Sequence, residues 1–370
     1  MSSPPANGRS EANALPIAYN SGVRNFHSDN VAPACDAIMA ALSAANTGMA
    51  ASYGGDESTA RLQSVAGKLF ETEVAVFPVA TGTAANSLAL SQIAAPFGAI
   101  YCYEAAHIVT DECGAPEFFS GGAKLIGFPA ADGKIRPEQL EHAIAFAQEM
   151  GVHHVKPAAI SLTQATEWGT VYTLSELAAI SAVAKKHRLP VHMDGARFAN
   201  ALVRLNTTPA QMTWQSGIDV LSFGATKGGA LAAEAVVVFD PARAAFFGER
   251  RKRAGHLVSK HRFIAAQMAA YLAGDCWLVL ARHANAMADR LAQGLKSAGF
   301  EPVWPVEANL IFVAVPRALD VKLKAAGASY YVRPSESLDL GADRVLLRLV
   351  TSFATEAAEI ERFVNLCKKF

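Results

Sequence analysis

The strongest constraint on the fold is an alternation of short apolar runs with helix-like segments through the middle of the chain. Seven runs have the length and apolar content of buried strands, at residues 74–79, 99–103, 124–127, 158–162, 190–193, 220–223 and 235–239. Strands that alternate with helices in this way are typical of a mostly parallel sheet with helices on both of its faces. We therefore predict an α/β fold for the larger part of the chain.

Helical patterns lie between these runs, and the pattern changes near residue 256. The clearest are at 58–69, 137–150 and 174–186, the last preceded by Thr173, which is placed to cap it three residues before Glu176. After residue 256, a long helical stretch over 261–295 precedes strand-like runs at 309–315 and 344–350 and a final helix at 356–369. We predict a loose tail at 1–20, a large domain at 21–255 and a small α+β domain at 256–370.

Composition and charge narrow the class of protein. Hydrophobic residues make up 51% of the 370 residues and charged residues 18%, which is the reverse of the balance found in disordered chains. Lysine plus arginine and aspartate plus glutamate number 33 each, so no polybasic surface for nucleic acid is indicated. The basic run at 250–253 is expected to be a solvated helix face. Small molecules and further copies of the chain are the expected partners.

Two further observations favour a cytoplasmic protein. The five cysteines are scattered and form no C-x-x-C pair, which argues against a disulfide framework or a zinc site, and no metal is expected. Residues 74–103 carry no charged side chain, but Pro78, Gly82, Pro96 and Gly98 interrupt them. We therefore predict that this segment forms buried elements of the α/β sheet and no membrane helix.

A small polar turn at residues 79–86 follows the first of these strands and precedes a helical run at 87–93. Gly82 permits the close approach of a ligand, and free N–H groups at a helix start, together with hydroxyls such as that of Thr83, can bind a phosphate. Many strand-to-helix turns are rich in glycine and threonine for their geometry alone. This signal by itself leaves both interpretations open.

Two charged motifs stand at the ends of later strands, where open α/β sheets place their ligands. Asp194 and Arg197 follow the strand at 190–193, where the aspartate can face a cationic nitrogen and the arginine an anionic oxygen. Their alternative is a buried ion pair that holds a loop. Lys227 follows the strand at 220–223 among small residues, where a desolvated lysine can form a Schiff base; its alternative is a surface lysine in a glycine turn.

The order of these three signals is more informative than any one of them. A phosphate turn, a strand-end aspartate and, about thirty residues later, a strand-end lysine form the order expected for pyridoxal 5′-phosphate on an aspartate-aminotransferase-type scaffold. The sequence contains neither G-x-G-x-x-G after a strand nor G-x-x-x-x-G-K-[ST], so dinucleotide and P-loop chemistry lack support.

With these residues the chain resembles the low-specificity L-threonine aldolases, within the β-eliminating-lyase branch of the fold-type I pyridoxal-phosphate enzymes, from about Phe26 onward. Six segments in the family's order carry the similarity, and H-M-D-G-A-R at 192–197 is the most specific of them. The others are F-H-S-D-N at 26–30, Y-G-G-D at 53–56, T-G-T-A-A-N at 81–86, A-A-H at 105–107 and R-L-V-T at 348–351.

The resemblance implies a role for each matching residue around the cofactor. Lys227 would hold pyridoxal phosphate as a Schiff base, Asp194 would pair with its ring nitrogen, and Arg197 would contact its ring hydroxyl. Gly82 and Thr83 would bind its phosphate.

The remaining matches concern the substrate and the neighbouring subunit. His107 would stack on the ring and move the proton of a β-hydroxyl group. Ser28 and Arg348 would bind the substrate carboxylate, since arginine offers it a bidentate match. Tyr53 would lie near the cofactor across a subunit boundary, so a homo-oligomer is expected, either a tetramer or a dimer with shared sites.

The activity that the resemblance implies is cleavage of L-threonine, L-allo-threonine and related β-hydroxy-α-amino acids, phenylserine among them, to glycine and an aldehyde. Two alternatives stay open. One is another fold-type I reaction, β-elimination or transamination, on the same framework, and the other is a noncatalytic homologue that binds the cofactor.

Two positions depart from the family's pattern. Where relatives supply an arginine to a neighbour's phosphate site, this chain has G-H-L-V-S-K at 255–260, so Lys260 is the expected substitute. Glu167 stands where many relatives have a histidine near the substrate's β-hydroxyl group. Either Glu167 faces that hydroxyl and helps His107 to receive its proton, which is the arrangement we expect, or it turns outward and Trp168 lines the aldehyde side.

Overall fold

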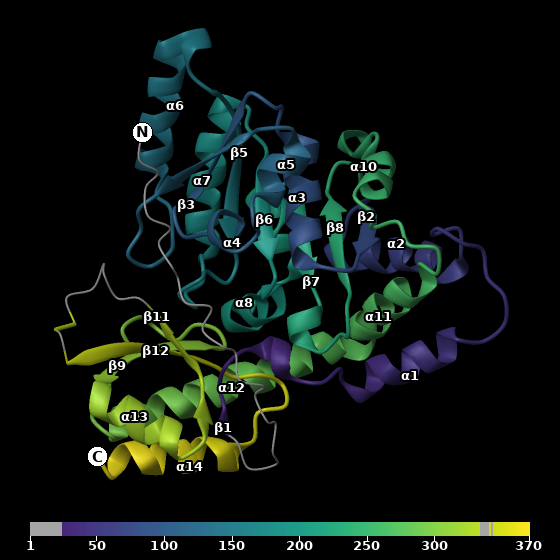
Figure 1. The fold of residues 1–370 in the computed structure, drawn as a ribbon. Coiled ribbons are helices and arrows are strands. Elements are labelled where there is room, and N and C mark those ends of the chain that lie inside the picture. The colour runs from purple at the N-terminus through teal and green to yellow at the C-terminus, as the bar shows by residue number, and fades with distance from the viewer. Residues whose placement is uncertain (1–23, 334–339, 342) are drawn as a thin grey trace, which may run out of the picture.

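The computed structural model describes residues 24–333, 340–341 and 343–370, so the expected tail at 1–20 lies outside it. Figure 1 shows a large α/β unit and, below it, a smaller unit with short strands and the last helices of the chain. The large sheet has seven strands in the order β2-β8-β7-β6-β5-β3-β4. β8 is antiparallel to both of its neighbours and the other adjacent pairs are parallel, so the predicted mostly parallel sheet is confirmed.

The strands of this sheet follow the predicted runs within a few residues. β6, β7 and β8 are buried along their whole length, as expected where helices cover both faces of a parallel sheet. The bounds are β2 (Ala75–Val79), β3 (Gly98–Tyr103), β4 (Lys124–Phe128), β5 (Lys156–Thr163), β6 (Val191–Gly195), β7 (Val220–Gly224) and β8 (Glu234–Val238).

The helices of the large unit were predicted best where a cap marks their start. α6 has the predicted bounds, and α7 begins as predicted because the side chain of Thr173 accepts a hydrogen bond from Glu176 N–H. α3 begins at Gly82, five residues before the predicted run, because Thr81 caps it through Ala84 N–H. The helices up to residue 253 are α1 (Asp36–Ala45), α2 (Glu57–Phe70), α3 (Gly82–Ile93), α4 (His107–Thr110), α5 (Ala115–Ser120), α6 (Pro137–Met150), α7 (Leu174–His187), α8 (Phe198–Leu205), α9 (Pro209–Met212) and α10 (Phe247–Arg253).

The long helical stretch predicted at 261–295 is two helices, so that expectation was wrong. α11 (Arg262–Leu272) and α12 (Cys276–Ser297) are separated by Gly274 and Asp275, both in the left-handed region with φ of 55° and 58°. By length and composition Arg262–Ser297 is apolar enough to cross a membrane, which is weak evidence because core helices pass the same test. Buried residues of α11, such as Met268 and Tyr271, pack in the core of the large unit.

The small unit has its own antiparallel sheet and its own core. The sheet has the order β11-β12-β9, and β1 pairs in parallel with β10 beside it. Phe26, directly after β1, packs edge-on against Phe363 of α14 with ring centroids 5.1 Å apart. The bounds are β1 (Arg24–Asn25), β9 (Leu310–Pro316), β10 (Ala328–Ser329), β11 (Tyr331–Arg333), β12 (Arg344–Val350), α13 (Arg317–Ala325) and α14 (Ala357–Lys368).

The predicted domain boundary at residue 256 does not separate the residues of the two cores. Phe26 is buried in the core of the small unit, whereas Ile264 and Trp277, beyond residue 256, are buried in the core of the large one. The N-terminal strand therefore crosses to the small unit before the chain enters α1. This crossing brings Ser28 and Asp29 to the junction of the two units.

Candidate active site

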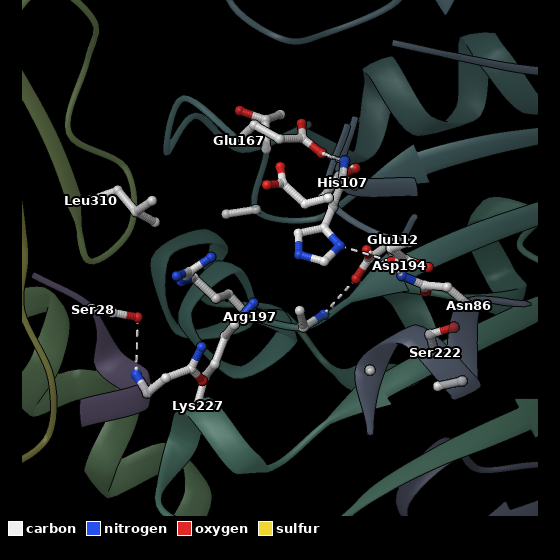
Figure 2. A pocket seen from close by; sticks show the side chains of 18 of the residues that line it. Ser28, Asn86, His107, Glu112, Glu167, Asp194, Arg197, Ser222, Lys227 and Leu310 are labelled. Carbon is white, nitrogen blue, oxygen red and sulfur yellow. Dashed lines mark hydrogen bonds and ion pairs between the residues drawn. The ribbon is translucent and has the colours of Figure 1, made fainter. Parts of the chain in front are cut away.

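A cavity lies at the carboxyl ends of β5, β6 and β7, where the small unit meets the large one. It is lined by eight of the eleven predicted site residues, which Figure 2 shows in part. These are Ser28, Gly82, His107, Glu167, Asp194, Arg197, Lys227 and Arg348. Residues from seven separate stretches of sequence thus converge on one space.

Asp194 is the second-last residue of β6 and lines this cavity, with 4% of its surface exposed. One carboxylate oxygen accepts a hydrogen bond from Ala196 N–H at 2.9 Å. The other accepts from the side-chain amide of Asn86, on α3, at 2.8 Å. Two donors therefore hold the carboxylate in one orientation, which fits a group that is to face a cationic ring nitrogen.

Lys227 lies in the 3₁₀ turn Thr226–Gly228 after β7, with its amine lining the cavity. Burial and the neighbouring Arg197 lower the pKa of its amine, against the opposing effect of Asp29 and other carboxylates. A lowered pKa favours the neutral, nucleophilic amine that Schiff-base formation requires. The next residue has to be small, because a Cβ on Gly228 would lie 2.0 Å from the hydroxyl oxygen of Tyr271.

Arg197 forms a bidentate ion pair with Asp29, a residue that the sequence reasoning did not single out. Its Nε and Nη2 atoms lie 2.7 and 2.9 Å from the two carboxylate oxygens. Asn309 donates a further hydrogen bond to Asp29 at 3.0 Å. The alternative interpretation, a buried ion pair between Asp194 and Arg197, is wrong, because the carboxylate partner of Arg197 comes from the N-terminal crossing. Asp29 does stand in the F-H-S-D-N motif, which was the available signal.

Arg348, on β12, reaches the cavity from the small unit. Its guanidinium donates to the carbonyl oxygen of His27 at 3.4 Å, and it has no carboxylate partner within the described residues. Burial, with the cationic Arg197 nearby, lowers the pKa of Arg348 to about 10, so it is still charged at neutral pH. A half-buried arginine without a carboxylate partner, beside a cavity, is suited to bind an anionic ligand group. Ser28 lines the same space.

His107 stands at the start of α4 with its ring against a second residue that sequence reasoning missed. Its Nδ1 lies 2.8 Å from the carboxylate of Glu112, whose side chain is completely buried. This hydrogen bond raises the pKa of His107, and burial raises the pKa of Glu112. Glu112 follows His107 by five residues, and a search for acids close to the A-A-H motif could have found it.

Glu167, in the loop after β5, lines the cavity, and its expected place beside the substrate's β-hydroxyl group stays a prediction. One carboxylate oxygen accepts hydrogen bonds from the Thr163 hydroxyl at 2.7 Å and from His107 N–H at 3.1 Å. The other oxygen is buried without a partner among the described residues. Burial raises the pKa of Glu167 to about 7. Trp168, which in the alternative arrangement would line the aldehyde side, is not among the residues that line the cavity. Its ring stacks on Trp304, with centroids 4.2 Å apart.

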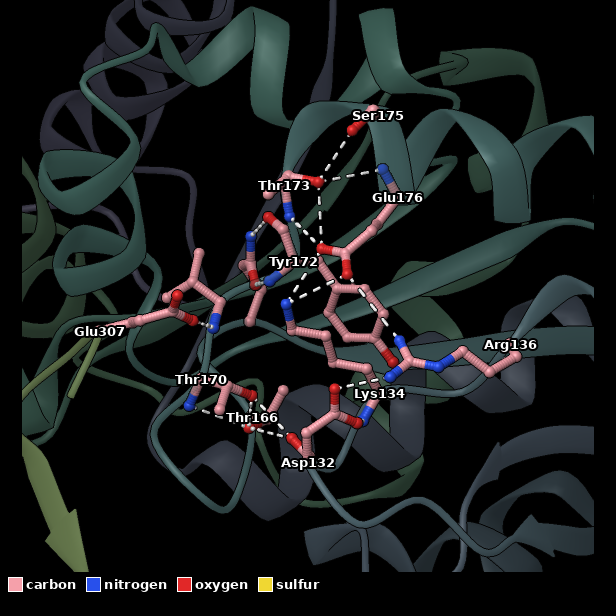
Figure 3. Close-up of polar contacts among 12 residues, drawn as sticks. Asp132, Lys134, Arg136, Thr166, Thr170, Tyr172, Thr173, Ser175, Glu176 and Glu307 are labelled. Carbon is pink, nitrogen blue, oxygen red and sulfur yellow. Dashed lines mark hydrogen bonds and ion pairs between the residues drawn. The ribbon is translucent and has the colours of Figure 1, made fainter. Parts of the chain in front are cut away.

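The loop that carries Glu167 is held by polar contacts to neighbouring segments, drawn in Figure 3. The hydroxyl groups of Thr166 and Thr170 bond to each other at 2.8 Å, and Thr170 also donates to the carbonyl oxygen of Asp132. Val171 N–H donates to the Glu307 carboxylate at 2.7 Å, which ties the loop to the small unit. These contacts of Thr166, Thr170 and Val171 hold the loop, and with it Glu167, in place.

Three predicted residues do not line this cavity. Thr83 lies in the first turn of α3, one residue beyond the lining Gly82. Tyr53 is half exposed, with the Lys252 ammonium 4.3 Å from its ring centre, and its N–H donates to Ser259 O, beside the exposed Lys260. Tyr53 and Lys260 thus lie near each other outside this chain's own cavity, and their placement at a neighbour's site stays a prediction.

The basic run at 250–253 was expected to be solvated, which is wrong for one residue. Arg251 is 8% exposed, and its guanidinium donates to the carbonyl oxygen of Pro78 at 3.2 Å. The same guanidinium lies 3.1 Å from Nε2 of His261, whose pKa burial lowers to about 4, so that its neutral ring can accept the bond. Arg251 thus joins α10 to the end of β2.

The cavity fits pyridoxal phosphate by three independent observations. The N–H groups of Gly82 and Thr83, in the first turn of α3, have no hydrogen-bond partner in the part of the chain that is described. A Cβ built on Gly82 would meet no atom within 4 Å, so the space before these donors is open. The amine of Lys227 and the carboxylate of Asp194 line the same cavity. These groups match the phosphate, the aldehyde carbon and the ring nitrogen of that cofactor.

Comparison with known proteins agrees with this geometry. The family model described as beta-eliminating lyase matches residues 25–318. The low-specificity L-threonine aldolase of Pseudomonas aeruginosa is 43% identical over 309 residues, which cover 83% of this chain and 89% of that protein. The solved structure of the Leishmania major threonine aldolase has 30% identity and a TM-score of 0.87, over 93% of this chain and 98% of that one.

A more distant structure shares the fold alone. The N-succinyldiaminopimelate aminotransferase of Mycobacterium tuberculosis has 15% identity and a TM-score of 0.70, over 94% of this chain and 93% of that one. Together, fold and site define an enzyme with the architecture of the fold-type I pyridoxal-phosphate class. Within that class the chain belongs to the beta-eliminating lyase family, and it groups there with the low-specificity L-threonine aldolases.

Proposed function

We propose that this protein is a pyridoxal-phosphate-dependent aldolase that cleaves L-threonine, L-allo-threonine and related β-hydroxy-α-amino acids to glycine and an aldehyde. The observation that carries the proposal is the convergence of Lys227, Asp194 and His107 on one cavity, which Arg348 also lines. The names of the Pseudomonas aeruginosa and Leishmania major relatives support the choice of reaction.

The residues that would hold the cofactor follow from the three matching groups. Lys227 would bind its aldehyde carbon, Asp194 its ring nitrogen, and the N–H groups of Gly82 and Thr83 its phosphate. When bound, pyridoxal phosphate supplies an electron sink that allows a bond at the substrate's Cα to break. Asp194 serves this chemistry because its anionic carboxylate favours a protonated ring nitrogen.

The remaining groups act on the substrate. Arg348 and Ser28 would bind its carboxylate, and Arg197, fixed by Asp29, lies beside them. Figure 2 shows the second ring nitrogen of His107 directed away from Glu112 and into the cavity, where it can accept the proton of the β-hydroxyl group. Glu167 lines the cavity on the same side as His107 and can add a second acceptor when it is ionised.

The protein is further proposed to act in the cytoplasm as a homo-oligomer with shared sites, a tetramer or a dimer. Tyr53 and Lys260, which lie on an exposed part of the chain away from its own cavity, support this arrangement. In it, Lys260 of each subunit would add a positive charge to its neighbour's phosphate site.

Product analysis tests the proposed reaction. Purified protein supplied with pyridoxal phosphate and L-threonine should form glycine and acetaldehyde in equal amounts. A 2-oxo acid with ammonia would instead identify β-elimination, and a 2-oxo acid formed only with an added amino acceptor would identify transamination. Lys227→Ala serves as the inactive control. Lack of any turnover of threonine, allo-threonine and phenylserine would favour the noncatalytic alternative.

A further inference from the structure

Glu112 is a buried acid next to the catalytic cavity that the proposed function does not yet use. It lies in the connection between α4 and α5, with its side chain completely buried. One oxygen receives two contacts, from Nδ1 of His107 and from the amide nitrogen of Asn86, each at 2.8 Å. The other oxygen is buried and has no partner among the described residues. Burying a carboxyl group with one oxygen unpartnered costs free energy. A functional role for its contact to His107 would explain why the group is there.

Asn86 connects this carboxyl group to the one that would face the cofactor ring. Its Nδ2 donates to Glu112 at 2.8 Å and to Asp194 at 2.8 Å, which uses both hydrogens of the amide. Because both neighbours are acids, the amide nitrogen and not the oxygen has to face them. The oxygen of Glu112 that Asn86 contacts is the same oxygen that Nδ1 of His107 contacts. The result is one continuous chain of hydrogen bonds from His107 to Asp194.

We propose that Glu112 is a positioning residue that accepts Nδ1–H of His107 and thereby directs the unprotonated Nε2 into the cavity. Asn86 holds Glu112 in this position and links it to Asp194. The inference rests on the proposed function, in which His107 receives a proton from the substrate's β-hydroxyl group. Nε2 has no partner within the described residues, and 41% of the His107 side chain is exposed, so this nitrogen is free for a ligand.

The chemistry is that of a histidine oriented by a buried acid. During proton transfer the β-hydroxyl O–H bond breaks and an Nε2–H bond forms, while Nδ1–H stays on His107. The imidazolium produced is stabilised by the carboxylate of Glu112, 2.8 Å away. Without that carboxylate the ring can place its single proton on either nitrogen, and a proton on Nε2 blocks the acceptor. Glu112 thus selects the reactive tautomer and supports the charged one.

Other charged groups also lie near the ring of His107, and some of them shift its pKa. Asp194 and Glu112 both raise the pKa of His107, Lys227 opposes them, and Glu167 accepts from the backbone N–H of the same residue. The exposed Asp111 also borders the cavity. Glu112 is the one among these acids whose carboxylate contacts the ring of His107.

Kinetics of two variants test the proposal. Glu112→Gln keeps an oxygen that can accept both existing hydrogen bonds but removes the charge, and Glu112→Ala removes the acceptor. We expect kcat for threonine to fall about tenfold or more in Glu112→Ala, given the contribution of a general base, with KM changed less than about threefold. In Glu112→Gln the acidic limb of the kcat/KM profile should shift to lower pH, because loss of the carboxylate lowers the pKa of His107.

Controls separate this role from a structural one. Glu117→Gln changes a nearby acid on α5 that does not line the cavity, and it should leave kcat and the acidic limb unaltered. In a His107→Asn background, Glu112→Gln should change kcat less than about twofold, since the two residues act as one unit. An equal loss in both backgrounds, or an unshifted acidic limb with reduced kcat, would overturn the proposal.

A spectroscopic readout tests the tautomer independently of turnover. Long-range proton–nitrogen correlation spectra of the purified protein, labelled with ¹⁵N-histidine and assigned with His107→Asn, identify which ring nitrogen carries the proton. We expect Nδ1–H in the wild type at alkaline pH and a shift toward Nε2–H in Glu112→Ala. A wild-type His107 with Nε2–H would refute the positioning role. If the spectra agree while threonine is not cleaved, the proposed function fails and the Glu112–His107 contact stands.

Discussion

Glu167→Gln replaces a buried carboxyl group that can ionise with a side chain that cannot. Burial raises the pKa of Glu167 from 4.5 to about 7, even though Thr163 and His107 donate hydrogen bonds to it. This rise corresponds to about 3 kcal/mol in favour of the neutral carboxyl in the folded protein. Glutamine is neutral at every pH and has nearly the same shape, so the variant loses this pH dependence.

The sign of the effect follows from the two pKa values. Because folding raises the pKa of Glu167, the folded state binds the proton more tightly than the unfolded state. The associated stability is complete below about pH 4.5 and is lost as the pH rises through about 7. At pH 8.5 the free energy of unfolding of Glu167→Gln should therefore exceed that of the wild type by about 3 kcal/mol. At pH 5 the difference should be below about 1 kcal/mol.

Urea denaturation followed by circular dichroism at pH 5 and pH 8.5 measures these differences. Glu149→Gln, at an exposed position on α6, is the matched control and should leave stability nearly unchanged at both values. An equal difference for Glu167→Gln at pH 5 and pH 8.5 would refute the reasoning. The same variant reports on catalysis: if ionised Glu167 assists His107, the ratio of wild-type to variant kcat grows from pH 6 to pH 8. A loss below about threefold on both threonine and phenylserine would remove Glu167 from the proton path.

Three further outcomes are expected. Lys227→Ala should no longer attach pyridoxal phosphate covalently on borohydride reduction, while peptide mapping of the wild type should find the label on Lys227; a label on another lysine would contradict the assignment. Arg348→Ala should raise KM for amino acids about tenfold or more and leave cofactor affinity nearly unchanged, because a lost charged hydrogen bond costs about 1.5–3 kcal/mol; an unchanged KM would exclude the carboxylate role. Sedimentation should find an oligomer, with activity lowered by Tyr53→Ala, and a fully active monomer would contradict shared sites.

The elements that sequence predicted best are those with a local signal. The bounds of α6 and the start of α7 are set by residues within one turn, as Thr173 and Glu176 illustrate. The strand-end positions of Asp194 and Lys227 follow from apolar runs just before them, and the parallel sheet then brings both residues to one edge. Local pattern and sheet topology together were enough to place the centre of the site.

What sequence could not supply are contacts between segments that lie far apart. Asp29 pairs with Arg197 across 168 positions, and Asn86 reaches Asp194 across 108, so no spacing rule links them. The break at Gly274 was missed because glycine inside an apolar helical pattern is tolerated often enough to leave the pattern intact. The crossing of Phe26 into the second core likewise depends on pairing between β1 and β10, at opposite ends of the chain.

The central claim, cleavage of the Cα–Cβ bond of a β-hydroxy-α-amino acid, is tested most directly by isotope incorporation. The wild-type protein with pyridoxal phosphate is incubated with L-threonine in D₂O, and the products formed at early times are analysed by mass spectrometry. Bond cleavage followed by protonation at Cα predicts glycine with one carbon-bound deuterium, together with one equivalent of acetaldehyde. Formation of 2-oxobutyrate and ammonia without glycine would contradict the account.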